Sequence, residues 1–289
     1  MRHKAMSMLV GVTLATLVLL ALPAGTTAAE PVLQRVNRTG KLTAGTRTES
    51  IPFAYLNDKK EWVGFSVDLI KEIQGRLERN LAKKIKLELK AVTPENRFQM
   101  VADGTVDLEC GSTTYTRSRD ETVDFSINFF YSSGQLLIKA DGPIKAPKDI
   151  PGKRIGVARG TTTEKIIRTK LPQVNVVLVQ DHGEGFQALQ QGKIDAYASD
   201  GILLAGLALR APNAQDFAIV GGFSFEPYSC IVPENDSKWR DFVNHTFMEL
   251  IESGTYFEIY DKWFGANGVV PYKAPDEAKF LTLMQVMPR

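Results

Sequence analysis

The chain has few of the residues from which metal centres and disulfide frameworks are built. Its 289 residues include only two cysteines, Cys110 and Cys230, and three histidines. His3 lies in the N-terminal leader and His245 lies within an expected helix, so His182 has no companions at metal-ligand spacing and we expect no metal site. In an oxidising compartment the two cysteines form either one disulfide or two buried thiols, and the sequence leaves both alternatives open.

The sequence also lacks the short motifs of common enzymes and an excess of either charge. It contains no Gly-x-Ser-x-Gly elbow, no His-Glu-x-x-His pair and no P-loop, so we expect no catalytic residue and no cofactor. The chain has 35 Lys and Arg against 33 Asp and Glu, and loss of Arg2 and Lys4 with the leader removes the difference. Nucleic-acid binding usually requires a basic excess, so we expect no nucleic-acid partner.

Residues 1–28 have the pattern of a secretory signal peptide. A charged start at residues 2–4 precedes an apolar run, Met8 to Leu22, that is shorter than the roughly 20 residues a membrane span needs. Small residues then follow, and we expect cleavage near Ala28 or Ala29 and a periplasmic location. The alternative is an uncleaved membrane anchor. No cysteine lies at the cleavage site, so we expect no attached lipid.

Beyond the leader, strand-like and helix-like segments alternate. Residues 85–92 alternate apolar with charged side chains, as a strand does, whereas apolar residues in 63–76 recur at helical spacing. Thr93 and Pro94 indicate a helix cap and first helical residue, and Gly104 ends that helix. Further strands are expected at 41–45, 105–110, 154–157 and 194–198. This alternation predicts an α/β fold with mostly parallel sheets.

A weak internal repeat indicates two similar lobes. Phe98-Gln99, Gly104 and Asp107 recur 88 residues later as Phe186-Gln187, Gly192 and Asp195. Each copy has the pattern of an amphipathic helix, a glycine stop and a short strand, and the same offset relates Ser112 to Asp200. Ligands of open α/β sheets bind beyond the carboxyl ends of the strands, so we expect a ligand between the two lobes.

Two crossing segments are expected to join the lobes. Leu136 to Ile138 would lead out of the first lobe, and Tyr228 to Val232 would return, because the apolar helix that follows needs a partner surface. We therefore expect a discontinuous first lobe, residues 30–133 and 230–289, a second lobe at 134–229, and a hinge between them.

The segment Gly160 to Glu164 offers a site for an anion. It follows the strand at 154–157, and Thr161 and Glu164 have capping-box spacing at the start of a helix. Thr161 and Thr162 would lie beside free backbone N–H groups at the positive end of the helix dipole, which suits a carboxylate. An ordinary capped helix would have the same sequence, and this alternative stays open.

Arginines and hydroxyls gather at expected strand ends. Arg97 stands in the first turn after Pro94. A cation there opposes the helix dipole and destabilises the helix by about 0.3 kcal/mol or more. That cost is tolerable where the guanidinium binds a carboxylate, although a solvated arginine or a pair with Glu95 would also fit. The other polar residues at these strand ends are two arginines, two hydroxyls and one carboxylate: Arg47, Arg119, Ser112, Thr114 and Asp200. Together the arginines supply more positive charge than one α-carboxylate requires, and Asp200 supplies a negative charge for an ammonium group. This combination favours an acidic amino acid as the ligand.

Several segments carry a family resemblance through their order and spacing. They are Gly45-Thr-Arg-Thr-Glu-Ser-Ile-Pro-Phe, Gly64-Phe-Ser-Val-Asp-Leu, Glu95-Asn-Arg, Glu109-Cys-Gly-Ser-Thr-Thr, Gly160-Thr-Thr, Asp181-His-Gly and Lys262-Trp-Phe. From about Lys41 to Gly265 the chain resembles the polar amino-acid branch of the bacterial extracellular solute-binding proteins, and closely its glutamate/aspartate-binding members. The resemblance implies a two-lobed periplasmic-binding-protein fold (type II) with two crossing hinge strands. It also implies docking on the membrane permease of an ABC importer, and we expect a monomer.

The resemblance implies a role for each candidate residue. In such proteins the α-carboxylate is held by residues that match Arg119, Thr114 and Thr161, and the α-ammonium by residues that match Asp200 and Ser112. Arg47, Arg97 and His182 match the residues that hold the side-chain carboxylate of an acidic ligand. One departure is Pro94, where members with acidic substrates commonly have a serine that bonds this carboxylate.

Three alternative functions stay open. An uncharged amino acid such as glutamine would leave two arginines hard to explain, because buried unpaired cations are costly. Periplasmic dehydratases acting on cyclohexadienyl substrates look like the same fold, but they need a carboxylic general acid, whereas Asp200 is expected to hold an ammonium group. A ligand sensor or surface adhesin is disfavoured, since no transmembrane or signalling region follows the expected lobes.

Overall fold

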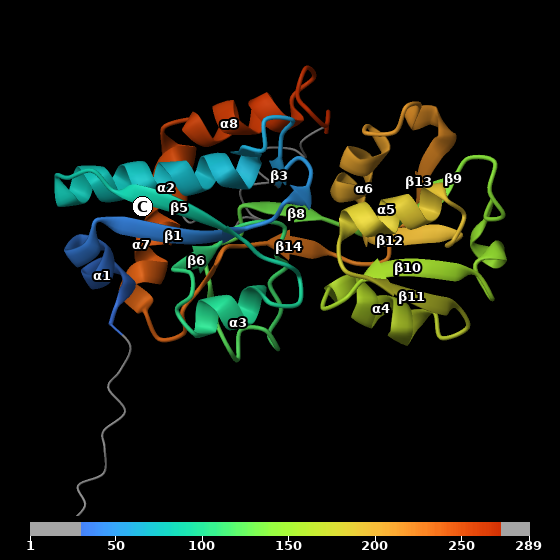
Figure 1. Ribbon diagram of the computed structural model, residues 1–289, viewed down its shortest axis with the longest axis horizontal. Helices are drawn as coiled ribbons and strands as arrows, with labels where there is room; N and C mark the ends of the chain where they lie inside the picture. The colour runs from blue at the N-terminus through green and yellow to red at the C-terminus, as the bar shows by residue number, and fades with distance from the viewer. Residues whose placement is uncertain (1–29, 273–289) are drawn as a thin grey trace, which may run out of the picture. The chain divides into compact units, whose positions relative to one another are not determined.

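A computed structural model describes residues 30–272, and Figure 1 shows its helices and strands. The expected signal peptide at 1–28 and the last part of the expected first lobe, 273–289, lie outside the described residues. Within residues 30–272, no helix is long and apolar enough to cross a membrane. The chain forms two five-stranded sheets covered by helices, which confirms the predicted α/β architecture. The sheets are mixed and not mostly parallel as expected, because each has two parallel and two antiparallel strand pairs.

The first sheet joins strands from both ends of the described chain. Its order is β5–β1–β6–β15–β7, and β1 pairs in parallel with both β5 and β6. β15 inserts antiparallel between β6 and β7, so the sheet is discontinuous in sequence. The strands are β1 (Lys41–Thr46), β5 (Lys86–Ala91), β6 (Leu108–Glu109), β7 (Asp124–Phe125) and β15 (Ile231–Val232).

The second sheet is built from one continuous stretch of chain. Its order is β11–β10–β12–β9–β13; β10 pairs in parallel with β11 and β12, whereas β9 runs antiparallel between β12 and β13. The strands are β9 (Gly134–Lys139), β10 (Arg154–Ala158), β11 (Asn175–Val179), β12 (Ala196–Asp200) and β13 (Phe217–Val220).

Helices cover both faces of the first sheet (Figure 1). One core includes side chains of α1 (Val32–Thr39), α2 (Phe65–Leu81), α7 (Ser237–Glu252) and α8 (Thr255–Phe264). On the other face α3 (Arg97–Ala102) packs Val101 beside Ile231. Successive side chains of a strand point to opposite faces. Ile231 therefore packs in the core beside α3, and Val232 packs in the larger core on the other face.

The second sheet is also packed on both faces. Leu136 and Ile138 of β9 pack with Ile167 of the helix α4, whereas Leu137 packs with Leu204 of α6 on the opposite face. The helices here are α4 (Thr162–Lys170), α5 (His182–Gln190) and α6 (Gly201–Ala208), with two 3₁₀ turns at Pro147–Asp149 and Ala214–Asp216.

Two short antiparallel strands, β8 (Phe130–Ser132) and β14 (Glu226–Tyr228), pair between the two large sheets. Two crossing strands were predicted, and both come earlier than expected. Leu136 to Ile138 lies inside β9, and of the expected return crossing, Tyr228 to Val232, only Tyr228 belongs to β14, because Ile231 and Val232 form β15. A short apolar run has the same pattern in a crossing segment and in a buried strand. A third small sheet follows β1 and consists of β2 (Glu49–Ser50), β3 (Ala54–Leu56) and β4 (Trp62–Val63).

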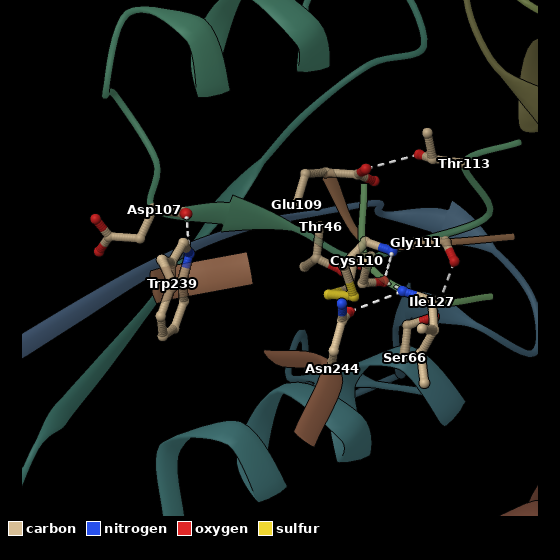
Figure 2. Close-up of a disulfide and its surroundings, with 12 residues drawn as sticks. Thr46, Ser66, Asp107, Glu109, Cys110, Gly111, Thr113, Ile127, Trp239 and Asn244 are labelled. Carbon is tan, nitrogen blue, oxygen red and sulfur yellow. Dashed lines mark hydrogen bonds between the residues drawn. A yellow bond between two sulfur atoms is a disulfide. The ribbon is translucent and has the colours of Figure 1, made fainter. Parts of the chain in front are cut away.

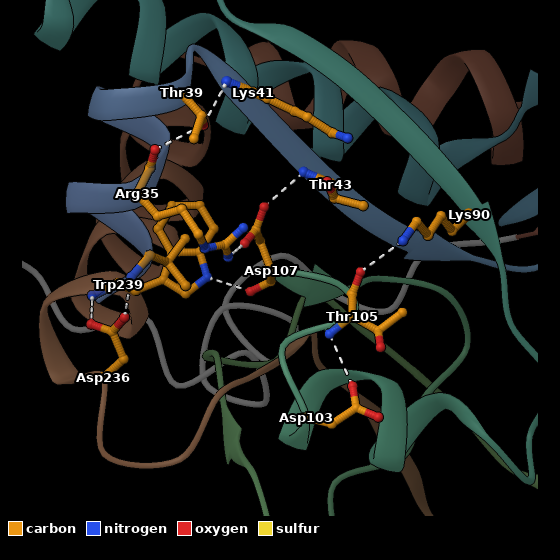
Figure 3. Close-up of polar contacts among 11 residues, drawn as sticks. Arg35, Thr39, Lys41, Thr43, Lys90, Asp103, Thr105, Asp107, Asp236 and Trp239 are labelled. Atoms are coloured by element: carbon orange, nitrogen blue, oxygen red, sulfur yellow. Dashed lines mark hydrogen bonds and ion pairs between the residues drawn. The ribbon is translucent and has the colours of Figure 1, made fainter. Parts of the chain in front are cut away.

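The two aspartates of the internal repeat make equivalent contacts. The Asp107 carboxylate accepts the backbone N–H of Thr43 at 2.7 Å, and the Asp195 carboxylate accepts that of Arg154 at 2.8 Å. The N–H of each aspartate in turn donates to the carbonyl of the same partner, at 2.8 Å in both sheets. Figure 3 shows the contacts of Asp107, which also pairs with Arg35. The repeat therefore corresponds to the same pair of hydrogen bonds between neighbouring strands, formed once in each large sheet.

Cys110 and Cys230 form a disulfide, which decides between the two alternatives that the sequence left open. It connects the residue after β6 to the residue before β15, two neighbouring strands of the first sheet (Figure 2). The hydroxyls of Thr46 and Ser66 donate to the carbonyls of Cys110 and Gly111, at 3.1 and 2.9 Å. The backbone that leaves β6 is therefore held from several sides.

The helix expected from Thr93 and Pro94 begins three residues later, at Arg97. Residues 94–96 form a turn in which the Thr93 N–H donates to the Asn96 side chain at 2.8 Å and the Asn96 N–H donates to the Thr93 hydroxyl at 3.2 Å. These side chains satisfy the backbone in a turn and so compete with a helix. Arg97 still lies in the first helical turn, as expected.

Candidate ligand-binding site

A small cavity lies between loops of the two large sheets. Its lining consists of Arg47, Arg97, Ser112, Thr114, Thr161, Thr162, Thr163, His182, Ser199, Asp200 and Leu203. Eight of the nine residues that the sequence predicted for a ligand are among these. The ninth, Arg119, lies against the same loops: its guanidinium donates to the Thr114 carbonyl at 2.8 Å and to the Gly160 carbonyl at 3.1 Å. The fold therefore brings all nine into one neighbourhood.

The carboxyl ends of the central strands explain this convergence. Arg47 follows β1 and Ser112 follows β6, two parallel neighbours in the first sheet. From the second sheet, Thr161 follows β10 and Asp200 ends β12, which are again parallel neighbours. Side chains beyond such ends meet at one edge of each sheet, where open α/β folds place their ligands.

The cavity encloses about 20 Å³, which is room for about one water molecule. Contacts between the two sets of loops keep it narrow: the Thr162 hydroxyl donates to the Glu226 carboxylate at 2.7 Å, and the Gly183 N–H donates to the Glu49 carboxylate at 2.9 Å. A guest the size of an amino acid can enter only when these loops separate.

Two arginines, Arg47 and Arg97, form a buried pair at the cavity, each 3% exposed. Burial and the neighbouring Arg97 lower the pKa of Arg47 to about 10, and burial lowers the pKa of Arg97 as well. Arginine keeps its proton in proteins, so both guanidinium groups are charged at neutral pH. Arg97 Nη1 donates to the Thr113 hydroxyl at 2.7 Å, and its buried Nε has no hydrogen-bond partner in the described chain.

Two buried carboxylates also belong to the site, although sequence reasoning missed them. Glu109 ends β6 and accepts a hydrogen bond from the Thr113 hydroxyl at 2.6 Å, and its burial raises its pKa. Glu226, on β14, accepts the hydroxyls of Thr114 and Thr162, each at 2.7 Å. The excess of positive charge expected from the sequence is thus offset within the cleft. The sequence does contain one indication of Glu109: in the Glu109-Cys-Gly-Ser-Thr-Thr segment, a charged residue stands at the end of a buried strand.

Asp200 has one occupied and one unpaired oxygen. The Tyr228 hydroxyl donates to Oδ2, whereas Oδ1 is buried without a hydrogen-bond partner among the described residues. Burial and the nearby Glu226 raise the pKa of Asp200 to about 7. The free oxygen gives the cavity an acceptor for a cationic donor.

His182 is a neutral side chain in this site. Burial and the charges of Arg47 and Arg97 lower its pKa to about 3. Its Nδ1 lies 2.8 Å from the Tyr197 hydroxyl, whose own pKa is raised by burial, so this hydroxyl stays protonated. His182 can therefore act as a hydrogen-bonding group but adds no charge.

Arg119 connects the loops of the two sheets. Besides its bonds to Thr114 and Gly160, its guanidinium lies 4.9 Å from the centre of the Phe98 ring. Burial and Arg97 lower its pKa to about 9, which leaves it charged at neutral pH. The alternative pairing of Arg97 with Glu95 does not occur, because Glu95 is exposed and lies 3.9 Å from Arg159 instead.

The predicted helix cap beside the cavity is present with one change. The Thr161 hydroxyl accepts the Glu164 N–H at 3.1 Å, as expected, but the Glu164 carboxylate accepts the N–H of Gly160 instead of that of Thr161. Within residues 30–272, no group of three or more His, Cys, Asp or Glu side chains is arranged to hold a metal ion.

Comparison with known proteins gives consistent matches over most of the chain. Residues 42–266 match the model of a family described as bacterial extracellular solute-binding proteins, family 3. The L-glutamate/L-aspartate-binding protein of Pseudomonas aeruginosa is 35% identical over 240 residues, which cover 80% of this chain and 79% of the relative.

Solved structures give the same architecture. An ancestral arginine-binding protein bound to glutamine is 32% identical, with a TM-score of 0.71 over 78% of this chain and 98% of the other. An ancestral amino acid-binding protein, described as a precursor of cyclohexadienyl dehydratase, is 26% identical, with a TM-score of 0.73 over 80% of this chain and 99% of the other. These neighbours confirm the two-lobed fold that the resemblance implied.

Proposed function

Because the chain belongs to family 3 of the bacterial extracellular solute-binding proteins, we propose that it binds glutamate or aspartate for an ABC amino-acid importer. It acts as a periplasmic monomer that delivers its guest to the membrane permease. The first lobe comprises residues 30–133 and 230–289, the second comprises residues 134–229, and the guest lies between them. It catalyses no reaction and uses no cofactor.

The observation that carries this proposal is a pair of complementary unpaired groups at one cavity. Arg97 Nε is a buried cationic donor without a partner among residues 30–272, and Asp200 Oδ1 is a buried anionic acceptor without one. Buried polar groups are normally satisfied, so each favours a guest that brings the opposite group. A zwitterion with a second carboxylate brings both.

The α-groups of the guest are assigned to residues from both lobes. Arg119, Thr114 and Thr161, with the N–H groups at the start of α4, hold the α-carboxylate. This arrangement combines a cation with a helix N-terminus, both of which favour an anion. Asp200 accepts the α-ammonium through its free Oδ1, and Ser112 assists.

The side-chain carboxylate of the guest is assigned to Arg47, Arg97 and His182. The two guanidinium groups supply charge, whereas neutral His182 supplies a hydrogen bond. In the tautomer that Tyr197 favours by donating to Nδ1, the ring carries its proton on Nε2 and can donate to the carboxylate. Pro94 supplies no hydroxyl to this end of the site.

Binding and closure form one cycle in this proposal. The guest binds first to one lobe, and the second lobe then closes on it through Thr161, Thr162 and Asp200. Only contacts that are stronger in the closed state can shift the balance towards closure. A micromolar dissociation constant corresponds to about 8 kcal/mol, which several charge-assisted hydrogen bonds can supply after desolvation.

Thermal-shift screening of the mature protein against all protein amino acids tests the function. A ligand that binds the folded protein stabilises it by mass action, by about 2.7 kcal/mol at a concentration a hundred times its dissociation constant. This stabilisation raises the melting temperature. We expect the largest shifts with L-glutamate and L-aspartate. A larger shift with L-glutamine would instead indicate a guest with a neutral side chain.

The dehydratase alternative has its own test. One solved neighbour is described as a precursor of cyclohexadienyl dehydratase, so the fold accommodates that chemistry elsewhere. A dehydratase needs a proton-donating carboxyl group in the cleft, and Asp200 and Glu109 are the two buried carboxyl groups with raised pKa values there. Incubation of the protein with a cyclohexadienyl substrate should give no product; product formation would overturn the assignment as a binding protein.

A further inference from the structure

We propose that Glu109 is the built-in counter-ion of the arginine pair, Arg47 and Arg97, and that it sets how strongly the cleft prefers a guest with a side-chain carboxylate over its amide. The inference rests on the proposed function, because it concerns the same cleft and the same guest. It gives a role in specificity to a residue that is not one of the nine candidates.

Glu109 does not line the cavity, but one hydroxyl, that of Thr113, links it to the arginine pair that does. Its side chain is fully buried, and its Oε2 accepts the Thr113 hydroxyl at 2.6 Å. Thr113 in turn accepts a hydrogen bond from Arg97 Nη1 at 2.7 Å. Figure 2 shows the Glu109–Thr113 contact beside the disulfide. Glu109 Oε1 has no hydrogen-bond partner among the described residues.

Gly111 shows how closely Glu109 approaches the other arginine. A Cβ atom at residue 111 would lie 2.6 Å from Glu109 Oε1 and 3.1 Å from Arg47 Cγ. The carboxylate of Glu109 and the stem of Arg47 therefore both lie over the bare backbone of Gly111. A side chain at this position would displace the Glu109 carboxylate or the Arg47 stem, so their close approach favours glycine here.

The charges that face Glu109 come from three elements. They are Arg47 after β1, Arg97 on α3 and Arg119 in the loop after β6, and each favours the ionised carboxylate. Burial acts in the opposite direction and is the larger effect, so the pKa of Glu109 is raised. Glu109 can therefore take up a proton when another negative charge approaches the same arginines.

The carboxylate of the guest and that of Glu109 act on the same two guanidinium groups. While Glu109 is ionised, it offsets part of the charge of the pair, and a guest with a neutral amide is tolerated. Without that charge, the pair is left uncompensated unless the guest supplies an anion, because buried unpaired cations are costly. Glu109 thus moderates the preference for an acidic guest.

Glu109→Gln tests this idea, because glutamine keeps the shape and an acceptor for Thr113 while removing the charge. Calorimetry would give dissociation constants of the wild type and the variant for L-glutamate and L-glutamine. We expect the ratio of the glutamine constant to the glutamate constant to rise at least tenfold in the variant. An unchanged or lower ratio would overturn the proposal.

Glu226→Gln is the matched control, since it removes a second buried carboxylate from the same cleft. Glu226 bonds the hydroxyls of Thr114 and Thr162, and its charge acts on Arg119 and Asp200. These residues serve the α-groups, which glutamate and glutamine share. The control should therefore change both constants by a similar factor and leave their ratio unchanged. A purely structural role of Glu109 would give the same result in Glu109→Gln.

A measurement on the wild type covers the case in which Glu109→Gln fails to fold. Calorimetry in two buffers of different ionisation enthalpy reports the protons taken up on binding. With measurements at several pH values between 5 and 8, we expect more proton uptake with L-glutamate than with L-glutamine in the range where Glu109 titrates, because only glutamate brings a charge that raises the pKa of Glu109 further. Equal uptake would overturn the inference. If the wild type binds neither of these guests nor L-aspartate, the proposed function itself fails.

Discussion

The side-chain carboxylate of Glu49 accepts a hydrogen bond from the backbone N–H of Gly183, 2.9 Å away. Glu49 begins β2, two residues after Arg47, and Gly183 follows His182 at the start of α5. The bond therefore joins the two sets of loops beside the residues assigned to the side-chain carboxylate of the guest. It can form only when these loops are close together.

Glu49→Ala should weaken guest binding about fivefold, since a typical hydrogen bond contributes about 1 kcal/mol. The loss should appear as faster dissociation, because the bond stabilises the closed form and not the encounter. Stopped-flow measurement of dissociation checks this. Glu49→Gln retains an acceptor for the Gly183 N–H and should dissociate almost as slowly as the wild type. Identical rates for Glu49→Ala and the wild type would show that the bond does not hold the cleft closed.

Lowering the pH should weaken binding of every amino acid through Asp200. Its pKa is raised to about 7 by burial and Glu226, so the ionised form that attracts an ammonium group is lost as the pH falls through 7. We expect the affinity for L-glutamine, whose side chain does not titrate, to fall by up to about tenfold per pH unit below that value. Calorimetry between pH 8 and pH 5 measures it. A flat profile would contradict the role of Asp200.

The same shift predicts how the stability of the ligand-free protein depends on pH. The unfolded chain has the ordinary pKa of an aspartate, about 3.9, so between about pH 4 and pH 7 the folded state holds a proton that the unfolded state has lost. The stabilising contribution of Asp200 is complete below this window and is lost as the pH rises through 7. Urea unfolding at pH 5 and pH 8 should therefore show a smaller pH effect in Asp200→Asn than in the wild type.

Arg97→Met should lower glutamate affinity about thirtyfold or more, because truncating one partner of a buried charged group costs about 2–5 kcal/mol. The substitution removes the unpaired Nε donor and the bond to Thr113, and it leaves Glu109 with less compensation. Calorimetry with L-glutamate measures the loss. Arg117→Met, which removes an exposed arginine from the loop after β6, is the control and should bind normally. Unchanged glutamate binding in Arg97→Met would refute the assignment of this arginine.

Removal of the disulfide by a Cys110→Ser, Cys230→Ser double substitution should lower the free energy of unfolding by about 2–5 kcal/mol. The bridge closes a long loop, since its cysteines are 120 residues apart in sequence. Urea unfolding with and without a thiol reductant measures the effect. The reductant should destabilise the wild type and leave the double variant unchanged. Equal stability of both proteins in oxidising buffer would contradict a stabilising disulfide.

Much of the site was predictable because its residues follow strands with clear patterns. Arg47 and Ser112 come directly after runs that read as strands, and parallel neighbouring strands bring their carboxyl ends together. The internal repeat related Ser112 to Asp200, and both line the cavity. Local pattern and a general rule of α/β topology were enough to gather these side chains.

The missed carboxylates depend on contacts that no local pattern encodes. Glu109 is stabilised by arginines from other elements and by Thr113, so its burial becomes visible only when β1, β6 and α3 are packed together. Glu226 lies beside Pro227 in a strand of three residues, which is too short to show a period. Helix α3 was placed three residues early, because the Thr93 and Asn96 side chains favour a turn.

Glu226 belongs to a strand that joins the two lobes, yet its carboxylate bonds a hydroxyl from each of them, Thr114 and Thr162. The crossing strand β14 is thus bonded to two residues that line the cavity. An optical reporter inserted into β14 would disturb recognition and rotation together. Sensor designs based on this protein should therefore attach their labels to other surfaces of the two lobes and leave β14 unmodified.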